Sequence, residues 1–199
     1  EKREFFLEGR GNFDFARGTN ARGAGIPTFF FSRRIGLQGP DVVPLQAGGR
    51  LTGKVGAFDV GALNIQTDDL FRAGAESTNF TVVRVKRDVL RRSTIGGIFT
   101  NRSVSLAGDG SNQVYGLDGR FAFFDNLNVL AYAARTQTTG RDGQDGSYFG
   151  QLNYAGDRYG LDAGHLIIED NFVPEVGFVR RGNMRRSSAS GRFSPRPRS

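Results

Sequence analysis

The residue in this sequence that is best suited to catalysis is His165, its single histidine. A histidine acts as the general base of a Ser/His/acid triad when a serine and a carboxylate are positioned beside it. His165 instead lies in phase with Tyr159, Leu161 and Ile167 in an alternating run, which predicts a side chain on the surface of a strand. We therefore expect no catalytic residues and no enzymatic activity.

Aspartates are the other residues that could do chemistry, by binding a metal, because the chain contains no cysteine. Asp68 and Asp69, and likewise Asp142 and Asp145, fall in polar stretches where carboxylate oxygens can bind calcium weakly. Solvated turns also favour aspartate, and this is its commoner role. The glycines at 140–146 lack the lysine and hydroxyl of a phosphate-binding loop. We expect neither a metal nor an organic cofactor.

Long alternating segments, which predict β-strands, must position these side chains. Around the turn Asp125-Asn126, for example, Tyr115 and Leu117 alternate with Asp118 over a run of about a dozen residues. A strand in a globular sheet averages about five or six residues. A membrane β-strand needs roughly 9 to 11 and places apolar and polar residues on opposite faces. The segment is therefore typical of a strand that crosses a bilayer.

Ten strands are predicted, joined by short turns at one end and longer polar loops at the other. They are 28–36, 50–56, 60–67, 78–86, 93–101, 112–124, 127–137, 147–154, 159–169 and 184–193. This pattern predicts an all-β, antiparallel up-and-down transmembrane β-barrel of about ten strands. Aromatic residues near strand ends, such as Phe123, Phe124, Tyr154 and Tyr159, are expected to form girdles at the membrane interfaces.

Composition supports a β-rich chain. The sequence has 29 glycines, 18 phenylalanines and one methionine, and it contains no run of about 20 apolar residues that could form a transmembrane helix. It opens on Glu1 rather than methionine, and we expect it to be a segment of a larger barrel protein. Residues 1–27 are expected to be an irregular periplasmic lead-in, and residues 28–199 the strands and loops of an incomplete barrel.

Basic residues gather at the end of the chain. Residues 1–179 are balanced in charge, so the net charge of +7 comes from Arg180, Arg181, Arg185, Arg186, Arg192, Arg196 and Arg198. Such a tail can bind phosphate non-specifically, but it can equally form one arginine-rich strand facing a wet lumen, or an exposed end. We expect no specific nucleic-acid partner.

Charged residues on the polar faces of the predicted strands are the candidate site residues. They are expected to face the lumen, where they either set solute preference or pair with one another to fill space. The six candidates are Lys54, Arg84, Lys86, Asp118, Arg120 and Asp162.

Several short motifs also resemble, in order, the C-terminal region of a bacterial family known as domain-of-unknown-function family 5916. Residues 1–9 with Phe13-Asp14-Phe15 are similar to its start. The other motifs are Phe31-Ser32-Arg33-Arg34-Ile35-Gly36, Leu51-Thr52-Gly53-Lys54, Asn101-Arg102, Val176-Gly177-Phe178-Val179-Arg180-Arg181 and Phe193-Ser194-Pro195-Arg196-Pro197. The resemblance implies an outer-membrane barrel joined, in the family, to an N-terminal carbohydrate-binding-family-9-like domain. It implies no catalytic residues, and the glycan-binding residues would lie outside this segment.

The functional hypothesis is a non-enzymatic barrel segment of the bacterial outer membrane with its N-terminus in the periplasm. Its partner would be outer-membrane lipid, and it would serve solute passage or anchor a periplasmic glycan-binding module. Two alternatives stay open. One is a soluble β-sandwich or barrel that binds polysaccharide or protein, because alternating strands with glycine-rich turns build those folds too. The other is an outer-membrane barrel enzyme that uses His165.

Overall fold

The computed structural model describes residues 10–16, 25–108 and 110–195 and shows an all-β protein. The strands of its main sheet are β3 (Leu45–Val55), β4 (Phe58–Thr67), β5 (Asn79–Val89), β6 (Ser93–Arg102), β7 (Asn112–Phe123), β8 (Leu127–Thr138), β9 (Gly146–Ala155), β10 (Tyr159–Ile168) and β11 (Met184–Phe193). A small second sheet pairs β1 (Leu37–Gln38) with β2 (Asp41–Val42). Short 3-10 helices are η1 (Arg10–Phe13), η3 (Ser32–Arg34) and η4 (Phe71–Ala73).

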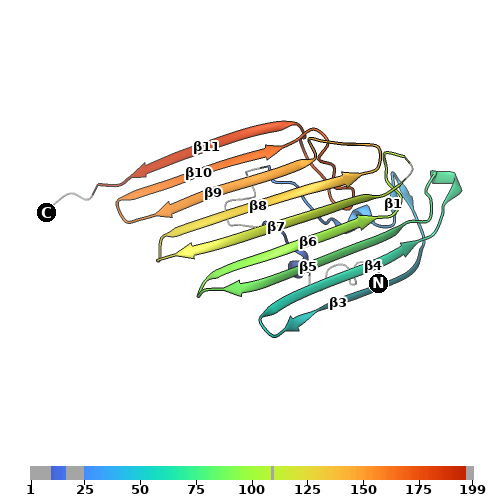
Figure 1. The fold of residues 1–199 in the computed structure, drawn as a ribbon, viewed down its shortest axis with the longest axis horizontal. Helices are drawn as coiled ribbons and strands as arrows, with labels where there is room; N and C mark the ends of the chain where they lie inside the picture. Colours follow the sequence, from blue (N-terminus) through green and yellow to red (C-terminus); the bar gives the residue numbers. More distant parts are fainter. Residues whose placement is uncertain (1–9, 17–24, 109, 196–199) are drawn as a thin grey trace.

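The main sheet has nine strands in which every strand is hydrogen-bonded to its neighbours in sequence, from β3 to β11. All these pairings are antiparallel, and Figure 1 shows the strands side by side in chain order. The predicted antiparallel up-and-down topology is confirmed. The sheet does not close into a barrel, however, because β3 and β11 form its two open edges.

Short and long connections alternate between the two ends of the sheet. The short turns are 56–57, 90–92, 124–126 and 156–158, and the long connections are 68–78, 103–111, 139–145 and 169–183. Three short turns contain a residue with left-handed backbone geometry: Gly56 (φ 60°), Leu90 (φ 57°) and Phe124 (φ 55°). Such a residue reverses the chain within a tight hairpin.

The prediction that residues 28–36 form the first strand is wrong. Thr28 makes only an isolated bridge with Phe178, and Ser32–Arg34 is a 3-10 helix. The backbone crosses one face of the main sheet, where Phe31 N donates to Val176 O at 3.0 Å. The apolar run that predicted a strand is explained by burial of Phe29, which is 2% exposed. In the described residues, the strands of the main sheet therefore begin at Leu45, and residues 28–44 lie outside that sheet.

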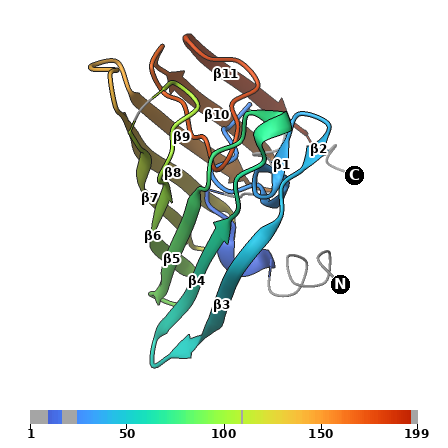
Figure 2. The ribbon, with the colours of Figure 1, turned by 90° about the vertical axis from the view of Figure 1, so that its right-hand side faces the viewer.

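One face of the main sheet, which we call the inner face, is covered by chain. The cover consists of residues 10–16 and 25–44, which we call the N-terminal segment, and of the 169–183 connection. Both segments lie on the same side of the sheet (Figure 2). Phe13, Phe15 and Phe29 of the N-terminal segment and Phe172 and Val176 of the connection are buried there in two apolar clusters with inner-face side chains. This packing forms the core of the protein.

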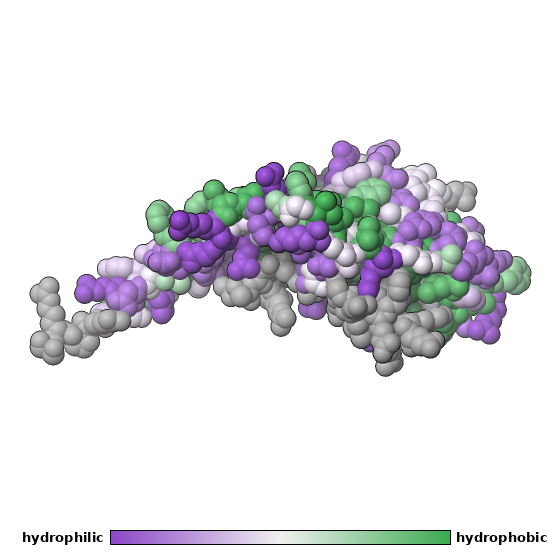
Figure 3. Space-filling model, turned by 90° about the horizontal axis from the view of Figure 1, so that it is seen from below, coloured by the Kyte–Doolittle hydropathy of each residue, from purple (hydrophilic) through white to green (hydrophobic). Residues whose placement is uncertain are grey.

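The opposite, outer face of the sheet carries no second layer in the described residues. The β1–β2 pair is the other sheet in these residues, so the two stacked sheets of a β-sandwich are not found. The molecule is an arch, with many apolar residues along its convex side (Figure 3). In the described ranges, no helix has the length and apolar character needed to span a membrane.

Candidate functional site

The structure places all six predicted lumenal residues on the inner face. Residues paired in register on neighbouring strands lie on the same face of a sheet. Lys54 and Lys86 are both paired with Asp59, on either side of β4. Lys86 is also paired with Gly96, which is paired in turn with Asp118, and Arg120 is paired with Thr94 on the same two strands as Asp118 and Gly96. The same pairing puts Arg84 opposite Gly61 and Ile98, and Asp162 opposite Asn153. Their common face follows from the two-residue period of a strand. Whether that face lines a lumen is a separate question, because the sheet is open.

Arg84, Lys86 and Asp118 are brought together beneath the N-terminal segment, where they hold its backbone. The Asp118 carboxylate accepts a hydrogen bond from Ala16 N at 2.9 Å, and Arg84 Nε donates to Asp14 O at 3.1 Å. Lys86 Nζ donates to Gly11 O at 3.4 Å. These side chains therefore satisfy polar backbone groups of a chain that lies over the sheet without joining its ladder.

Arg84 and Asp118 also form a buried ion pair. Arg84 Nη2 lies 2.7 Å from Oδ1 and 2.8 Å from Oδ2 of Asp118, and the two side chains are 3% and 13% exposed. The guanidinium lies 5.1 Å from the centroid of the Phe15 ring, which gives a cation–π contact. The two charges therefore pair with each other inside the protein and do not face a solute.

The other three predicted residues lie apart from this cluster. Lys54 lies 4.0 Å from Asp88 in an exposed ion pair. Asp162 accepts hydrogen bonds from Gln151 Nε2 and Asn153 Nδ2 at 3.1 and 2.9 Å. Arg120 is exposed on the inner face of β7. The six residues therefore share a face but do not form one site.

Two glycines of the inner face make room for aromatic rings of the N-terminal segment. A Cβ added at Gly116 would lie 2.8 Å from Phe15 Cζ, and one added at Gly61 would lie 3.1 Å from Phe13 Cε1. The Phe15 ring also contacts the tilted ring of Phe29 and meets Tyr132 edge to face, with ring centroids 4.4 and 5.7 Å away. The sheet and the segment thus fit one another closely.

A second polar cluster, around Glu175 and Asn112, fixes the 169–183 connection. Ser105 Oγ and Leu106 N donate to the Glu175 carboxylate at 2.7 and 2.8 Å, and Arg102 Nε lies 3.8 Å from it. Asn112 Nδ2 donates to Val173 O at 2.8 Å, and Glu175 N donates to Asn112 Oδ1 at 3.1 Å. The sequence analysis missed both residues. An acidic residue among Phe172, Val173 and Val176 was the available signal.

The outer face has the opposite character. The exposed large apolar side chains of the nine strands all project from it: Leu51, Val55, Phe58, Ile95, Tyr115, Leu117, Phe123, Tyr148, Leu152, Tyr154, Tyr159, Leu161 and Phe193. Its charged strand residues are Arg87, Arg135 and Arg185, each close to a strand end. The charges of the strands are otherwise on the inner face.

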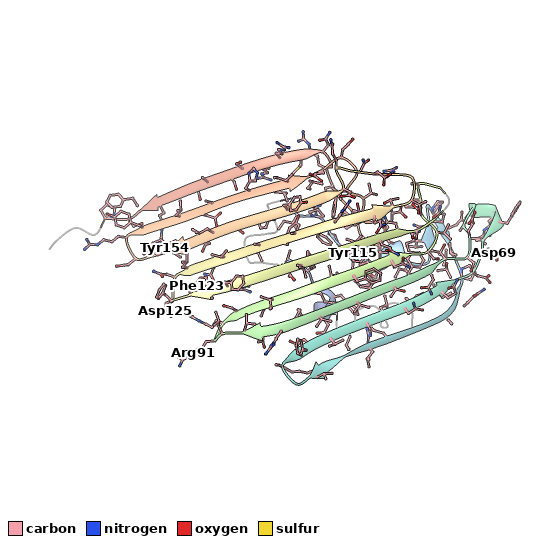
Figure 4. All side chains as sticks on the ribbon, viewed as in Figure 1. Asp69, Arg91, Tyr115, Phe123, Asp125 and Tyr154 are labelled. Carbon is pink, nitrogen blue, oxygen red and sulfur yellow. The ribbon has the colours of Figure 1, made fainter. Side chains whose placement is uncertain are left out.

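Aromatic residues mark two levels of the outer face. Phe123, Tyr154 and Tyr159 lie toward the short turns, whereas Tyr115 lies nearer the long connections (Figure 4). Three of the four predicted girdle residues, Phe123, Tyr154 and Tyr159, are therefore on this face near strand ends. The fourth, Phe124, lies in a turn and is exposed.

The residues considered for catalysis and metal binding have ordinary structural partners. His165 Nδ1 lies 2.8 Å from Ser187 Oγ on the outer face, and Asp162 projects from the other side of the same strand. Asp145 accepts two hydrogen bonds from Arg135 Nε, at 2.8 and 2.9 Å. Asp69 N and, to a smaller extent, Gln46 Nε2 donate to the Asp68 carboxylate, and these hydrogen bonds lower the pKa of its carboxyl. Within the described ranges, no cluster of three metal-ligating side chains occurs.

Comparison with known proteins gives no further guidance, because neither a protein-family model, nor a curated protein, nor a solved structure matches the chain.

Proposed function

We propose that the chain is a non-enzymatic segment of an outer-membrane β-barrel whose inner face is filled by its own N-terminal segment. The observation that carries the proposal is the contrast between the two faces of the sheet. The outer face exposes large side chains such as Leu51 and Leu117, which are 69% and 70% exposed, and the inner face holds most strand charges. Soluble proteins rarely expose contiguous apolar patches beyond a few hundred Å². Lipid would cover such a face, as it does in transmembrane barrels.

The distance between the two levels of aromatic residues, measured along the proposed membrane normal, supports the same proposal. From Tyr115 to Phe123 a strand advances about 26 Å at about 3.3 Å per residue. With a strand tilt of about 40°, this corresponds to about 20 Å along the membrane normal, close to the roughly 25 Å apolar band of known barrels. Leu117 lies between these levels on the same face. Tyr115 and Phe123 would then lie in the two interfacial regions.

The two open edges of the sheet, β3 and β11, must be paired if the sheet lies in a membrane. Exposed edge groups of β3 and β11 would be costly in lipid, because the bilayer core offers them no hydrogen-bond partners. We propose that further strands pair with both edges and close the barrel. The long edge strands would also promote aggregation in water if they were left unpaired.

The orientation follows from the connections. Transmembrane barrels have short periplasmic turns and longer outer loops, which would place 56–57 and the other short turns in the periplasm. Gly11 contacts Lys86 toward that end of the sheet, whereas β3 begins at Leu45 at the opposite end. The N-terminal segment would therefore enter from the periplasm and cross the interior before the first strand.

A filled interior favours anchoring over open passage. The Arg84–Asp118 pair and the aromatic packing of Phe15 and Phe29 occupy the inner face where a solute would have to pass. We propose that this part of the barrel anchors a periplasmic module. Following the ordered motifs that resemble domain-of-unknown-function family 5916, that module would be a carbohydrate-binding domain.

Vesicle flotation tests this proposal against the soluble alternative. The protein, with the strands that we propose pair with β3 and β11, is unfolded and diluted from urea either into buffer or into phospholipid vesicles, and each sample is then floated on a density gradient. We expect folded protein to float with the vesicles and the buffer sample to aggregate. A folded, monodisperse protein in buffer that does not float with added vesicles would favour a soluble β-domain that binds polysaccharide or protein.

A further inference from the structure

A small cavity lies at the long-connection end of the inner face. Its volume is about 250 Å³, and the N-terminal segment, the 68–78 connection and the end of β6 with the residues after it line its walls. Arg34 of η3 and Arg102 of β6 both line this cavity. A cavity of this size is slightly smaller than the range of about 300–1,000 Å³ for drug-sized ligands, so it would suit a small solute.

The two arginines are fixed by contacts that leave their terminal nitrogens available. Arg34 Nε donates to Gly177 O at 3.1 Å, and Arg102 Nε donates to Val104 O at 2.7 Å. Arg102 also packs 5.5 Å from the centroid of the Phe80 ring and is 11% exposed. Among the described residues, the hydrogen bonds of both guanidinium groups are made through Nε. The Nη groups are the donors that remain for a ligand.

The acidic residues near the cavity do not use up these donors. Glu175 is 3.8 Å from Arg102 Nε, but its side chain is 2% exposed and its oxygens already accept from Ser105 Oγ and Leu106 N. Glu76 lines the cavity from a loop and is exposed to solvent. The wall hydroxyls of Thr67 and Thr78 donate to backbone carbonyls. The arginine pair is therefore the main feature that can select a ligand.

We propose that this cavity binds a small solute through an oxyanion group, a carboxylate or a phosphate, held between Arg34 and Arg102. Guanidinium groups present parallel N–H donors that match these oxyanions, and such charge-assisted hydrogen bonds are about twice as strong as neutral ones. The proposal is independent of the membrane assignment, because it rests on the cavity alone.

Calorimetric titration of the folded protein with three probes tests the proposal. Inorganic phosphate and glucuronate carry the two oxyanions, and glucose is the neutral probe. All titrations are made at physiological ionic strength, where weak surface attraction is screened. We expect at least one anion to bind at millimolar concentration and glucose to give no binding heat. The anion that binds identifies the oxyanion.

Neighbouring arginines provide a matched pair of variants. Arg34→Gln should weaken anion binding about tenfold, because it removes the charge-assisted hydrogen bonds that one of the two guanidinium groups would donate to the anion. Arg33→Gln removes the same charge from the same helix but not from the cavity lining, and should leave the affinity unchanged. Arg34→Lys should bind more weakly than the wild type, since lysine cannot form the two-pronged contact. Absence of anion binding by the wild type, equal binding of glucose, or an equal loss in Arg33→Gln would overturn the proposal.

Discussion

Arg84 on β5 and Asp118 on β7 form an ion pair across the intervening strand β6, with Arg84 Nη2 2.7 Å from Asp118 Oδ1. The Arg84 guanidinium packs against the Phe15 ring, and the Asp118 carboxylate accepts a hydrogen bond from Ala16 N of the N-terminal segment. Arg84 Nη1 is buried and has no hydrogen-bond partner among the described residues. The pair therefore connects strands β5 and β7 to the N-terminal segment that covers them, although one guanidinium nitrogen makes no hydrogen bond.

Breaking this ion pair should be costly. Asp118→Asn leaves the Arg84 charge buried without compensation, and we expect it to lower the free energy of unfolding by about 3 kcal/mol. Arg120→Gln, on the same face of β7 but exposed, should change it by less than about 0.5 kcal/mol. Urea unfolding of both variants in the same lipid or detergent measures the difference. Similar values for the two variants would show that the pair has no special role.

Packing of Phe15 against the sheet predicts a selective effect at Gly116. In Gly116→Ala the new Cβ would lie 2.8 Å from Phe15 Cζ, so the ring must shift, at a cost of about 1–3 kcal/mol. We expect faster hydrogen exchange at Ala16 N, with the strands unaffected. Gly150→Ala is the control, since its Cβ would meet nothing within 4 Å. Equal protection of Ala16 N in both variants would contradict this packing.

Glu175 should stabilise the 169–183 connection through its charge. Glu175→Gln replaces the charge-assisted hydrogen bonds from Ser105 Oγ and Leu106 N with neutral ones and leaves Arg102 without its anionic partner, and we expect a loss of about 2 kcal/mol in the free energy of unfolding. The exposed Glu76→Gln should have little effect. Thermal unfolding followed by circular dichroism tests both. An unchanged midpoint in Glu175→Gln would mean that the carboxylate can be replaced without loss.

The outer face should be intolerant of charge in a membrane. Leu117→Lys places an ammonium group between the two aromatic levels, and should lower the stability of the inserted state by about 2–4 kcal/mol. Phe71→Lys is the matched control, because Phe71 is 99% exposed but lies in η4, outside the sheet. The fraction of each variant that folds into vesicles is the measurement that compares them. Equal yields would argue against lipid contact at Leu117.

The faces of the sheet could be predicted from the sequence because side chains alternate with a strict two-residue period. Lys54, Arg84 and Asp162 were assigned to one face on this basis, and the pairing register puts them there. The short turns also set the hairpin register, so β6, β7 and β10 were found close to their observed bounds.

The remaining features depend on contacts between distant parts of the chain. Residues 28–36 read as a strand because Phe29 and Ile35 are apolar, but both are buried against the sheet from outside its ladder. The Arg84–Asp118 contact requires the register across β6, which the sequence pattern does not specify. The open edges of the sheet at β3 and β11 do not follow from alternation either.

Spin-label accessibility tests the central claim most directly, because a chain without cysteine allows one label at each chosen position. Labels attached to Ala133→Cys on the outer face and to Asp69→Cys in a long connection are compared in phospholipid vesicles. If the outer face contacts lipid, the label at position 133 should collide readily with oxygen and rarely with a water-soluble nickel chelate, and the label at 69 should show the reverse. Equal access of the nickel chelate to both positions would contradict the membrane assignment.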